Sequence, residues 1–219
     1  MKILMYSVRD DEEAAIKDWA AKNKVRVDTN DLEFHPDTAE LTKGYDGVVI
    51  QQRSAIGDDP AVYQQLAGYG LKQVTSRTAG VDTIDIPAAK AAGLAVTNVP
   101  AYSPNSVAEM AVTQTMRLIR NLELFDSRIS QQNFQWAGLQ AREIRSLTVG
   151  VIGAGRIGGT VARLFHGLGA KVIAYDLVHH DELTDVLTYV DSKEDLLKQA
   201  DVVTLHVDLN ETSKALIDG

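Results

Sequence analysis

The stretch from Leu147 to Asp176 limits what this chain can fold into more than any other part of it. An apolar, β-branched run over 147–152 enters a glycine turn at 153–158 with the sequence GAGRIG. A second apolar run, over 171–175, ends at the acid Asp176. This pattern predicts a strand, a tight turn, a helix and a second strand, which together make a βαβ unit.

The glycine turn has the G-x-G-x-x-G pattern that binds the pyrophosphate of a dinucleotide. Gly153 allows a sharp turn, Gly155 has no Cβ and lets the backbone approach a phosphate, and Gly158 lets the helix pack close to the strand. The first N–H groups of the helix lack partners and lie at the positive end of its dipole, which favours an anion. Asp176, 18 residues after Gly158, is placed to accept hydrogen bonds from both ribose hydroxyls. The alternative is an ordinary βαβ unit with a glycine-rich turn.

The composition is that of an ordinary globular protein, with 219 residues, 45% of them hydrophobic and 24% charged. The length allows one large domain or two small ones. A net charge of −8 and the lack of a basic stripe argue against a nucleic acid partner. The absence of cysteine excludes disulfides. No apolar run approaches the roughly 20 residues of a membrane helix, and the opening strand pattern is too short for a signal peptide. We therefore expect a cytoplasmic protein without a membrane partner.

Strand and helix patterns alternate over the first hundred residues. Strands are expected at 3–6, 25–28, 47–50, 73–76 and 95–97. The first helix is expected to have Asp10 or Asp11 as its N-cap and an apolar stripe that includes Ile16 and Trp19. Two further helices are expected at 61–69 and 86–92. This alternation predicts an α/β fold with a parallel sheet covered by helices on both faces.

The alternation stops at residues 98–104, where Pro100 and Pro104 indicate a hinge or domain boundary. Later elements are expected as helices at 106–120, at 122–131 and from Ser192, a loop at 134–140 and a strand at 201–207. The chain thus divides into an α/β region at 1–100 without the glycine pattern and an α/β region at 101–219 that contains it. A cofactor domain beside a second domain suggests an enzyme with a cleft between them.

Four stretches of the chain carry a family resemblance. They are 77–85 (RTAGVDTID), 98–105 (NVPAYSPN), 149–158 (VGVIGAGRIG) and 204–207 (TLHV). In this order and spacing they resemble the NAD-dependent D-2-hydroxyacid dehydrogenases, especially the D-lactate and D-2-hydroxyisocaproate dehydrogenases. The resemblance implies two doubly wound parallel-sheet domains. One is a flavodoxin-like substrate domain at 1–100, and the other is the first part of a Rossmann NAD-binding domain at 101–219.

On the substrate side, the resemblance implies that Thr78, Ala79 and Gly80 present backbone N–H groups to the carboxylate of a small 2-keto or 2-hydroxy acid. Small residues suit this role, because close approach of the backbone needs little side chain. Tyr102 is implied to line the active-site cleft, and the stretch from Gln51 to Arg53 is implied to face the substrate. The alternatives are a plain turn at 78–80 and a hinge aromatic at 102.

On the cofactor side, the resemblance implies that NAD is contacted from the glycine turn and from the ends of the strands. The implied residues are Gly153, Gly155, Arg156, Ile157, Gly158, Asp176, His206, Val207, Asp208 and Ser213. Asp208 departs from the family, which usually has Pro there, and so it places a charge near the nicotinamide-side loop. Ser213 stands where the family has Thr or Asn and keeps a hydroxyl. NAD is expected rather than NADP, because Asp176 would repel a 2′-phosphate and no Arg follows it in 177–180.

The family's catalytic Arg, Glu and His follow the strand that ends near His206, and none of them matches a residue of this sequence. We therefore interpret the chain as a C-terminally truncated dehydrogenase, with no catalytic residue assigned and no activity expected from these 219 residues alone. The implied reaction of the whole enzyme is hydride transfer between NADH and a 2-keto acid such as pyruvate, which gives a D-2-hydroxy acid. The alternative function is a non-catalytic NAD-binding module of the same fold, similar to a corepressor. No metal site is expected, since the adjacent His179 and His180 alone are a weak pattern.

The helices expected over 106–131 bear on assembly. In the family they pack in a two-fold interface. Apolar residues such as Met110, Val112 and Leu118 exceed what one small sheet can cover. We therefore expect a homodimer.

Overall fold

The computed structural model describes residues 1–51, 55–56 and 59–217. It divides into two compact units, Met1–Tyr102 with Asp208–Gly219, and Ser103–Val207. The first break therefore falls within the proline-containing stretch 98–104. Gln52 and Arg53, which were expected to face the substrate, lie outside the described residues.

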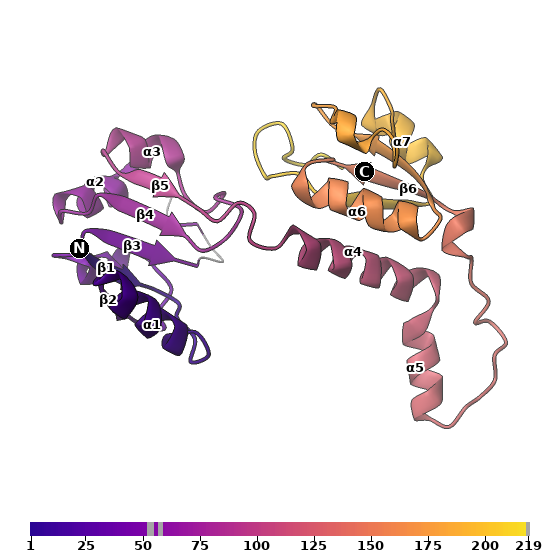
Figure 1. Ribbon diagram of the computed structural model, residues 1–219, viewed down its shortest axis with the longest axis horizontal. Coiled ribbons are helices and arrows are strands. Elements are labelled where there is room, and N and C mark those ends of the chain that lie inside the picture. The colour runs from indigo at the N-terminus through magenta and orange to yellow at the C-terminus, as the bar shows by residue number, and fades with distance from the viewer. Residues whose placement is uncertain (52–54, 57–58, 218–219) are drawn as a thin grey trace. The chain divides into compact units, whose positions relative to one another are not determined.

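The first unit is built on a five-stranded parallel sheet (Figure 1). Its strands are β1 (Lys2–Met5), β2 (Arg26–Thr29), β3 (Gly47–Ile50), β4 (Gln73–Ser76) and β5 (Ala95–Thr97). Their order across the sheet is β2-β1-β3-β4-β5, and all neighbouring pairs are parallel. This is the flavodoxin-like order, so the fold class expected for this region is confirmed.

The helices of the first unit cover the two faces of this sheet unequally. They are α1 (Glu13–Asn23), α2 (Pro60–Gly68), α3 (Ile86–Ala91) and the 3-10 helix η1 (Pro36–Thr42). One face, with Leu4, Val48 and Val74, forms a core with Leu66 of α2 and Ala89 of α3. The opposite face borders a groove of about 1200 Å³ that α1 lines with Ala15, Ile16 and Trp19. No residue of α1 is buried, so its apolar stripe stays at the surface.

The start of α1 differs from the expectation. Its N-cap residue is Glu12, not Asp10 or Asp11, and no side chain caps the helix. The Glu12 carboxylate instead accepts a hydrogen bond from the backbone N–H of Arg9, at 3.0 Å. The expected N-cap was therefore wrong: the helix begins after Glu12, whose carboxylate bonds back to the N–H of Arg9, three residues earlier.

The second unit has a four-stranded parallel sheet. Its strands are β6 (Thr148–Ile152), β7 (Lys171–Tyr175), β8 (Thr188–Tyr189) and β9 (Val202–Leu205), in the order β8-β7-β6-β9. All pairs are parallel. Renumbered from the first of these strands, the order is 3-2-1-4, which is the start of the dinucleotide-binding order. The Rossmann fold expected here is therefore confirmed.

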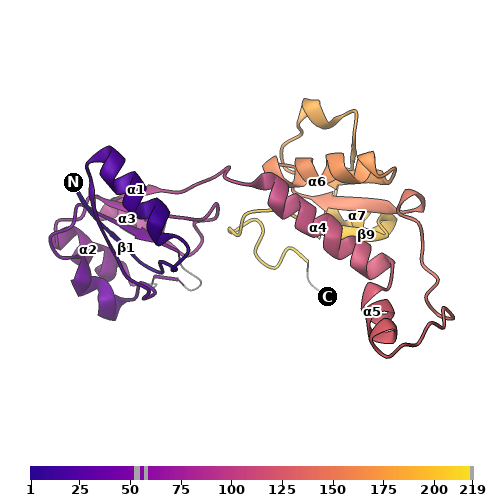
Figure 2. The same ribbon diagram turned by 60° about the horizontal axis from the view of Figure 1, so that its bottom comes forward.

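Helices cover both faces of the second sheet. They are α4 (Pro104–Ile119), α5 (Leu122–Ser130), α6 (Arg156–Gly167) and α7 (Lys193–Gln199), with the 3-10 helices η2 (Ile144–Ser146) and η3 (Asp181–Leu183). α4 and α6 lie side by side on one face and bury Ala108 and Phe165 against the core (Figures 1 and 2). On the other face α7 lies close to β6, since a Cβ on Gly150 would be 2.5 Å from Cδ2 of Leu196. Within this unit, α5 and the loop that follows it extend away from the sheet (Figure 1).

The second unit also confirms the helix start expected at Ser192. Its hydroxyl accepts from the backbone N–H of Asp195 at 3.1 Å and donates to the carboxylate of Asp195 at 2.8 Å. Among the described residues, no helix combines the length and apolar character needed to cross a bilayer.

Candidate functional site

The glycine turn 153–158 connects the end of β6 to the first turn of α6. Gly153 has φ +85°, and a Cβ on it would lie 2.8 Å from the carbonyl oxygen of His206. A Cβ on Gly158 would lie 1.8 Å from the carbonyl oxygen of Gly153. The protein's own backbone and packing therefore require glycine at both positions.

Gly155 is different from these two glycines. A Cβ on it would meet no heavy atom within 4 Å, and its φ of −67° is ordinary for a residue with a side chain. It is the N-cap residue of α6, directly before N–H groups that have no partner within the helix. No neighbouring atom of the protein occupies the place of a side chain here, whereas a phosphate that approaches the backbone would exclude one. The turn therefore fits the pyrophosphate of a dinucleotide.

The two residues between Gly155 and Gly158 differ in their surroundings. Arg156 is exposed, whereas Ile157 is half-buried and packs against the core of the second unit. Their proposed contacts with NAD remain predictions from the family resemblance.

Asp176 lies beside the glycine turn, at the end of β7. Its Oδ2 accepts from the backbone N–H of Ala154 at 2.5 Å, and its Oδ1 accepts from that of Val178 at 3.0 Å. An ionised carboxylate has about four lone-pair sites, so these two bonds leave acceptor capacity for a ligand. The structure thus brings the acid and the turn together, as a ribose linked to a pyrophosphate requires.

Two residues that the sequence reasoning did not assign follow this acid. Leu177 is 74% exposed and Val178 is 60% exposed. They form an apolar surface next to the Asp176 carboxylate. The signal in the sequence is the pair of apolar residues directly after the expected strand and its terminal acid.

His206 and Val207 follow β9, which pairs with β6 on the side away from β7. The backbone N–H of His206 donates to the carbonyl of Ile152 at 2.8 Å, and the Nε2 of His206 lies 2.8 Å from the hydroxyl of Thr204. Burial lowers the pKa of His206, which favours the neutral imidazole. A Cβ added to Gly153 would lie 2.8 Å from an atom of His206 and 2.8 Å from an atom of Val207, so both residues lie at the turn. This is the point where the strand order reverses and where α/β proteins bind ligands.

Asp208 and Ser213 lie in a turn of their own after β9. The Ser213 hydroxyl donates to the carbonyl of Asp208 at 2.5 Å and accepts from the backbone N–H of Asn210 at 2.9 Å. These residues group with the first unit. Their contact with a cofactor remains a prediction.

The loop Thr78–Gly80 follows the carboxyl end of β4. Its carbonyl groups are bonded: Ala79 accepts from Nδ2 of Asn98 at 2.6 Å, Gly80 accepts from the Thr78 hydroxyl at 2.7 Å, and Thr78 accepts from the N–H of Val99 at 3.1 Å. Among the described residues, the backbone N–H groups of Thr78, Ala79 and Gly80 have no acceptor. Free N–H groups on successive residues form a site for an anion, which fits a substrate carboxylate.

The remaining expected site residue is Tyr102, the last residue of the first unit before the chain passes into the second. Its side chain is 68% exposed. Its place in an active-site cleft remains a prediction.

The adjacent histidines 179 and 180 have local partners. His179 stacks on Tyr189 with ring centroids 4.0 Å apart, and Nδ1 of His180 lies 3.7 Å from a carboxylate oxygen of Glu182. Within the part of the chain that the structure describes, no group of three or more His, Cys, Asp or Glu residues is placed to hold a metal ion.

Comparison with known proteins identifies the class. Residues 112–219 match the family described as "D-isomer specific 2-hydroxyacid dehydrogenase, NAD binding domain". The chain belongs to the D-isomer specific 2-hydroxyacid dehydrogenase family, and its cofactor is NAD. The family resemblance inferred from the sequence is therefore confirmed.

Individual relatives agree with this class. The chain is 49% identical to a D-2-hydroxyacid dehydrogenase (NAD(+)) of Clostridioides difficile, over 100% of this chain and 66% of that protein. It is 68% identical to the structure of a D-lactate dehydrogenase from Sporolactobacillus sp, with a TM-score of 0.73, over 100% of this chain and 65% of the other. The NAD complexed form of a D-isomer specific 2-hydroxyacid dehydrogenase from Lactobacillus delbrueckii ssp. bulgaricus is 42% identical, with a TM-score of 0.76, over 99% and 66%. The chain thus spans 65–66% of the length of these relatives.

Proposed function

We propose that this protein acts as an NAD-dependent D-2-hydroxyacid dehydrogenase that reduces a 2-keto acid such as pyruvate to the D-2-hydroxy acid. Residues 1–100 serve as its substrate domain and residues 101–219 as the first part of its NAD-binding domain. The observation that carries the proposal is the open space at Gly155 beside the Asp176 carboxylate. A cytoplasmic location, where NADH is regenerated, belongs to the same proposal.

In this proposal the cofactor lies along the carboxyl ends of β6, β7 and β9. The N–H groups at the start of α6 hold the pyrophosphate, Asp176 accepts from the ribose hydroxyls, and Leu177 covers one face of the adenine. His206 and Val207 lie beside the nicotinamide half, because they contact the turn from the β9 side. The remaining contacts are assigned to Arg156, Ile157, Asp208 and Ser213.

The substrate contacts belong to the first unit. The free N–H groups of Thr78, Ala79 and Gly80 bind the substrate carboxylate and fix its orientation, and Tyr102 lines the pocket. When bound, NADH supplies the hydride that reduces the keto carbon, while the keto oxygen takes up a proton. No residue between 1 and 219 is assigned as the donor of that proton.

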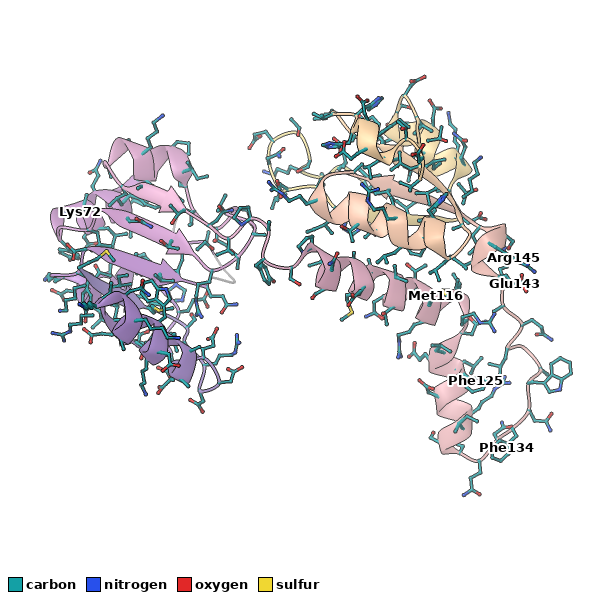
Figure 3. The ribbon with its side chains drawn as sticks, viewed as in Figure 1. Lys72, Met116, Phe125, Phe134, Glu143 and Arg145 are labelled. Carbon is teal, nitrogen blue, oxygen red and sulfur yellow. The ribbon has the colours of Figure 1, made fainter. Side chains whose placement is uncertain are left out.

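A homodimer is part of the proposal. An apolar surface on α4, α5 and the loop after them is exposed: Met110 by 58%, Leu118 by 77%, Phe125 by 45%, Phe134 by 76% and Trp136 by 73%. Figure 3 shows Phe125 on α5 and Phe134 at the end of the segment that extends from this unit. Large apolar side chains left exposed in this number on neighbouring segments are typical of a subunit interface.

Val112 does not belong to this surface. It is half-buried and packs against the core of its own unit, so of the three apolar side chains named from the sequence Met110 and Leu118 are the ones left exposed. It lies on the side of the helix that faces α6, whereas Met110 is exposed.

The proposal is tested with the full-length protein, NADH and a set of 2-keto acids that includes pyruvate and 2-ketoisocaproate. We expect NADH absorbance to fall with turnover and a D-specific assay to detect the product. The Gly155→Val variant serves as a control that lacks the cofactor site. NADH binding without turnover of any of these acids would overturn the proposal in favour of a non-catalytic NAD-binding module.

A further inference from the structure

Arg77 connects three segments at the carboxyl edge of the first sheet. Its backbone N–H donates to the carbonyl of Ile50, at the end of β3, at 2.9 Å. Its Nη2 donates to the carbonyls of Tyr6 and Ser7, directly after β1, at 3.0 and 2.8 Å. Arg77 itself follows the end of β4 and immediately precedes the loop Thr78–Gly80. One residue therefore links the ends of β1, β3 and β4: its side chain bonds the segment after β1, and its backbone bonds the end of β3.

The same guanidinium is paired with a carboxylate. Nη1 of Arg77 donates to Oε1 of Glu12 at 2.7 Å, and the two side chains are 16% and 23% exposed. Burial opposes ionisation of Glu12, but its hydrogen bonds from Arg9 and Arg77 outweigh this and lower its pKa below the ordinary value. The pair is therefore ionised at neutral pH, and it is shielded from solvent more than a surface ion pair is.

Stability alone does not explain this arrangement. The Nε of Arg77 is buried, and it has no hydrogen-bond partner among the described residues. A buried donor without an acceptor destabilises a fold. The carbonyl of Ser7 that Arg77 holds belongs to a residue with φ +53°, a backbone conformation uncommon outside glycine. Strained backbone and unsatisfied donors concentrate at functional sites.

We propose that Arg77 and Glu12 are positioning residues that hold the loop Thr78–Gly80 in the geometry needed to bind the substrate carboxylate. This inference rests on the proposed function, and neither side chain is assigned a contact with substrate. The guanidinium has a planar fork of donors that reaches one carboxylate and two carbonyls together, which the single ammonium of lysine does not reproduce. Because Thr78 follows Arg77 directly, a fixed Arg77 sets the direction in which the loop leaves β4. The direction of the loop in turn sets where its N–H groups point. A displacement of about 1 Å in such a group is enough to lower the rate by about 100-fold.

The test measures steady-state kinetics of the full-length protein with pyruvate and NADH. The variants Arg77→Lys and Arg77→Gln remove the fork, and Glu12→Ala removes its carboxylate partner. We expect KM for pyruvate to rise about tenfold or more, which corresponds to the loss of one well-placed group, while the Kd for NADH stays unchanged. Glu12→Gln keeps an oxygen acceptor for Nη1 and should recover part of the loss.

The control is Arg26→Gln on β2, which removes an arginine that is 67% exposed and paired with Asp28 in its own strand. It should leave both KM values unchanged. A purely structural role of Arg77 would lower the folded fraction and hence kcat per total protein, without raising KM for pyruvate. If Arg77→Gln does not fold, Arg77→Lys and Glu12→Ala provide the same comparison.

Two outcomes overturn the inference, and they are distinguishable. Turnover by the wild-type protein, with KM for pyruvate unchanged in Arg77→Lys and Glu12→Ala, overturns the positioning role alone. Absence of turnover by the wild-type protein, with NADH binding measured separately, overturns the proposed function and the positioning role with it.

Discussion

The carboxylate of Asp176 accepts a hydrogen bond from the backbone N–H of Ala154, with 2.5 Å between Oδ2 and the nitrogen. Asp176 ends β7, and Ala154 lies inside the glycine turn after β6, so this bond joins two segments that are 22 residues apart. The bond therefore holds Asp176, which is assigned to the ribose, against the glycine turn, which is assigned to the pyrophosphate. Substitution of the acid should therefore affect the turn as well as the ribose contact, and the two effects need separate variants.

The first prediction concerns cofactor choice. Because Asp176 would repel the 2′-phosphate of NADPH, we expect kcat/KM to favour NADH by about 100-fold, or about 2.7 kcal/mol. Asp176→Ala should reduce this ratio about tenfold or more. Asp176→Asn removes the charge but keeps an acceptor for the N–H of Ala154, so it separates repulsion from loosening of the turn. A wild-type preference for NADPH would contradict the prediction.

The second prediction separates two glycines of the same turn. In Gly155→Ala the added Cβ enters open space, so we expect weaker NADH binding by about tenfold or more with little change in Tm. In Gly158→Ala the Cβ would lie 1.8 Å from the carbonyl oxygen of Gly153. Overpacking of this kind costs about 3 kcal/mol, which lowers Tm by about 6–12 °C. Calorimetry measures Tm and titration with NADH measures binding. Equal losses of stability in the two variants would contradict the prediction that packing requires Gly158 but not Gly155.

The sequence was sufficient for the parts of the fold that depend on contiguous patterns. The βαβ unit over 147–176 follows from two apolar runs, a glycine turn and a terminal acid, all of which act over short range. The strand β8 has two residues, and two residues have no periodicity to detect. The N-cap of α1 could not be chosen correctly either, because Glu12 is fixed by Arg77, 65 residues away.

The candidate site shows the same division between local and tertiary information. The identity of its glycines and of Asp176 was readable from spacing. The packing that requires glycine at 153 depends on His206 and Val207, which a different strand brings to the turn. Likewise, that the N–H groups of 78–80 have no acceptor among the described residues becomes apparent only from the tertiary contacts of that loop.

The third prediction concerns assembly. Leu118 is 77% exposed on α4, within the surface proposed as the dimer interface. A carboxylate buried there without a partner is costly, so we expect Leu118→Glu to halve the molecular mass measured by light scattering. Leu197→Glu is the matched control, since Leu197 is 41% exposed on α7 on the other face of the same sheet. A monomeric wild-type protein at micromolar concentration would refute the dimer.

The last prediction concerns the dependence of stability on pH. Burial lowers the pKa of His206, so as pH falls below about 6.5 the unfolded chain takes up a proton at this residue before the folded chain does. The stability contributed by neutral His206 is complete above that pH, and it is lost progressively as pH falls toward the pKa of the folded state. His206→Asn does not titrate, so its free energy of unfolding should fall less steeply between about pH 6.5 and 5. Urea denaturation at several pH values measures these slopes, with His166→Asn on the exposed surface of α6 as the control. If the slope of His206→Asn equals that of the wild-type protein, the imidazole is not held in the neutral form by burial at the end of β9.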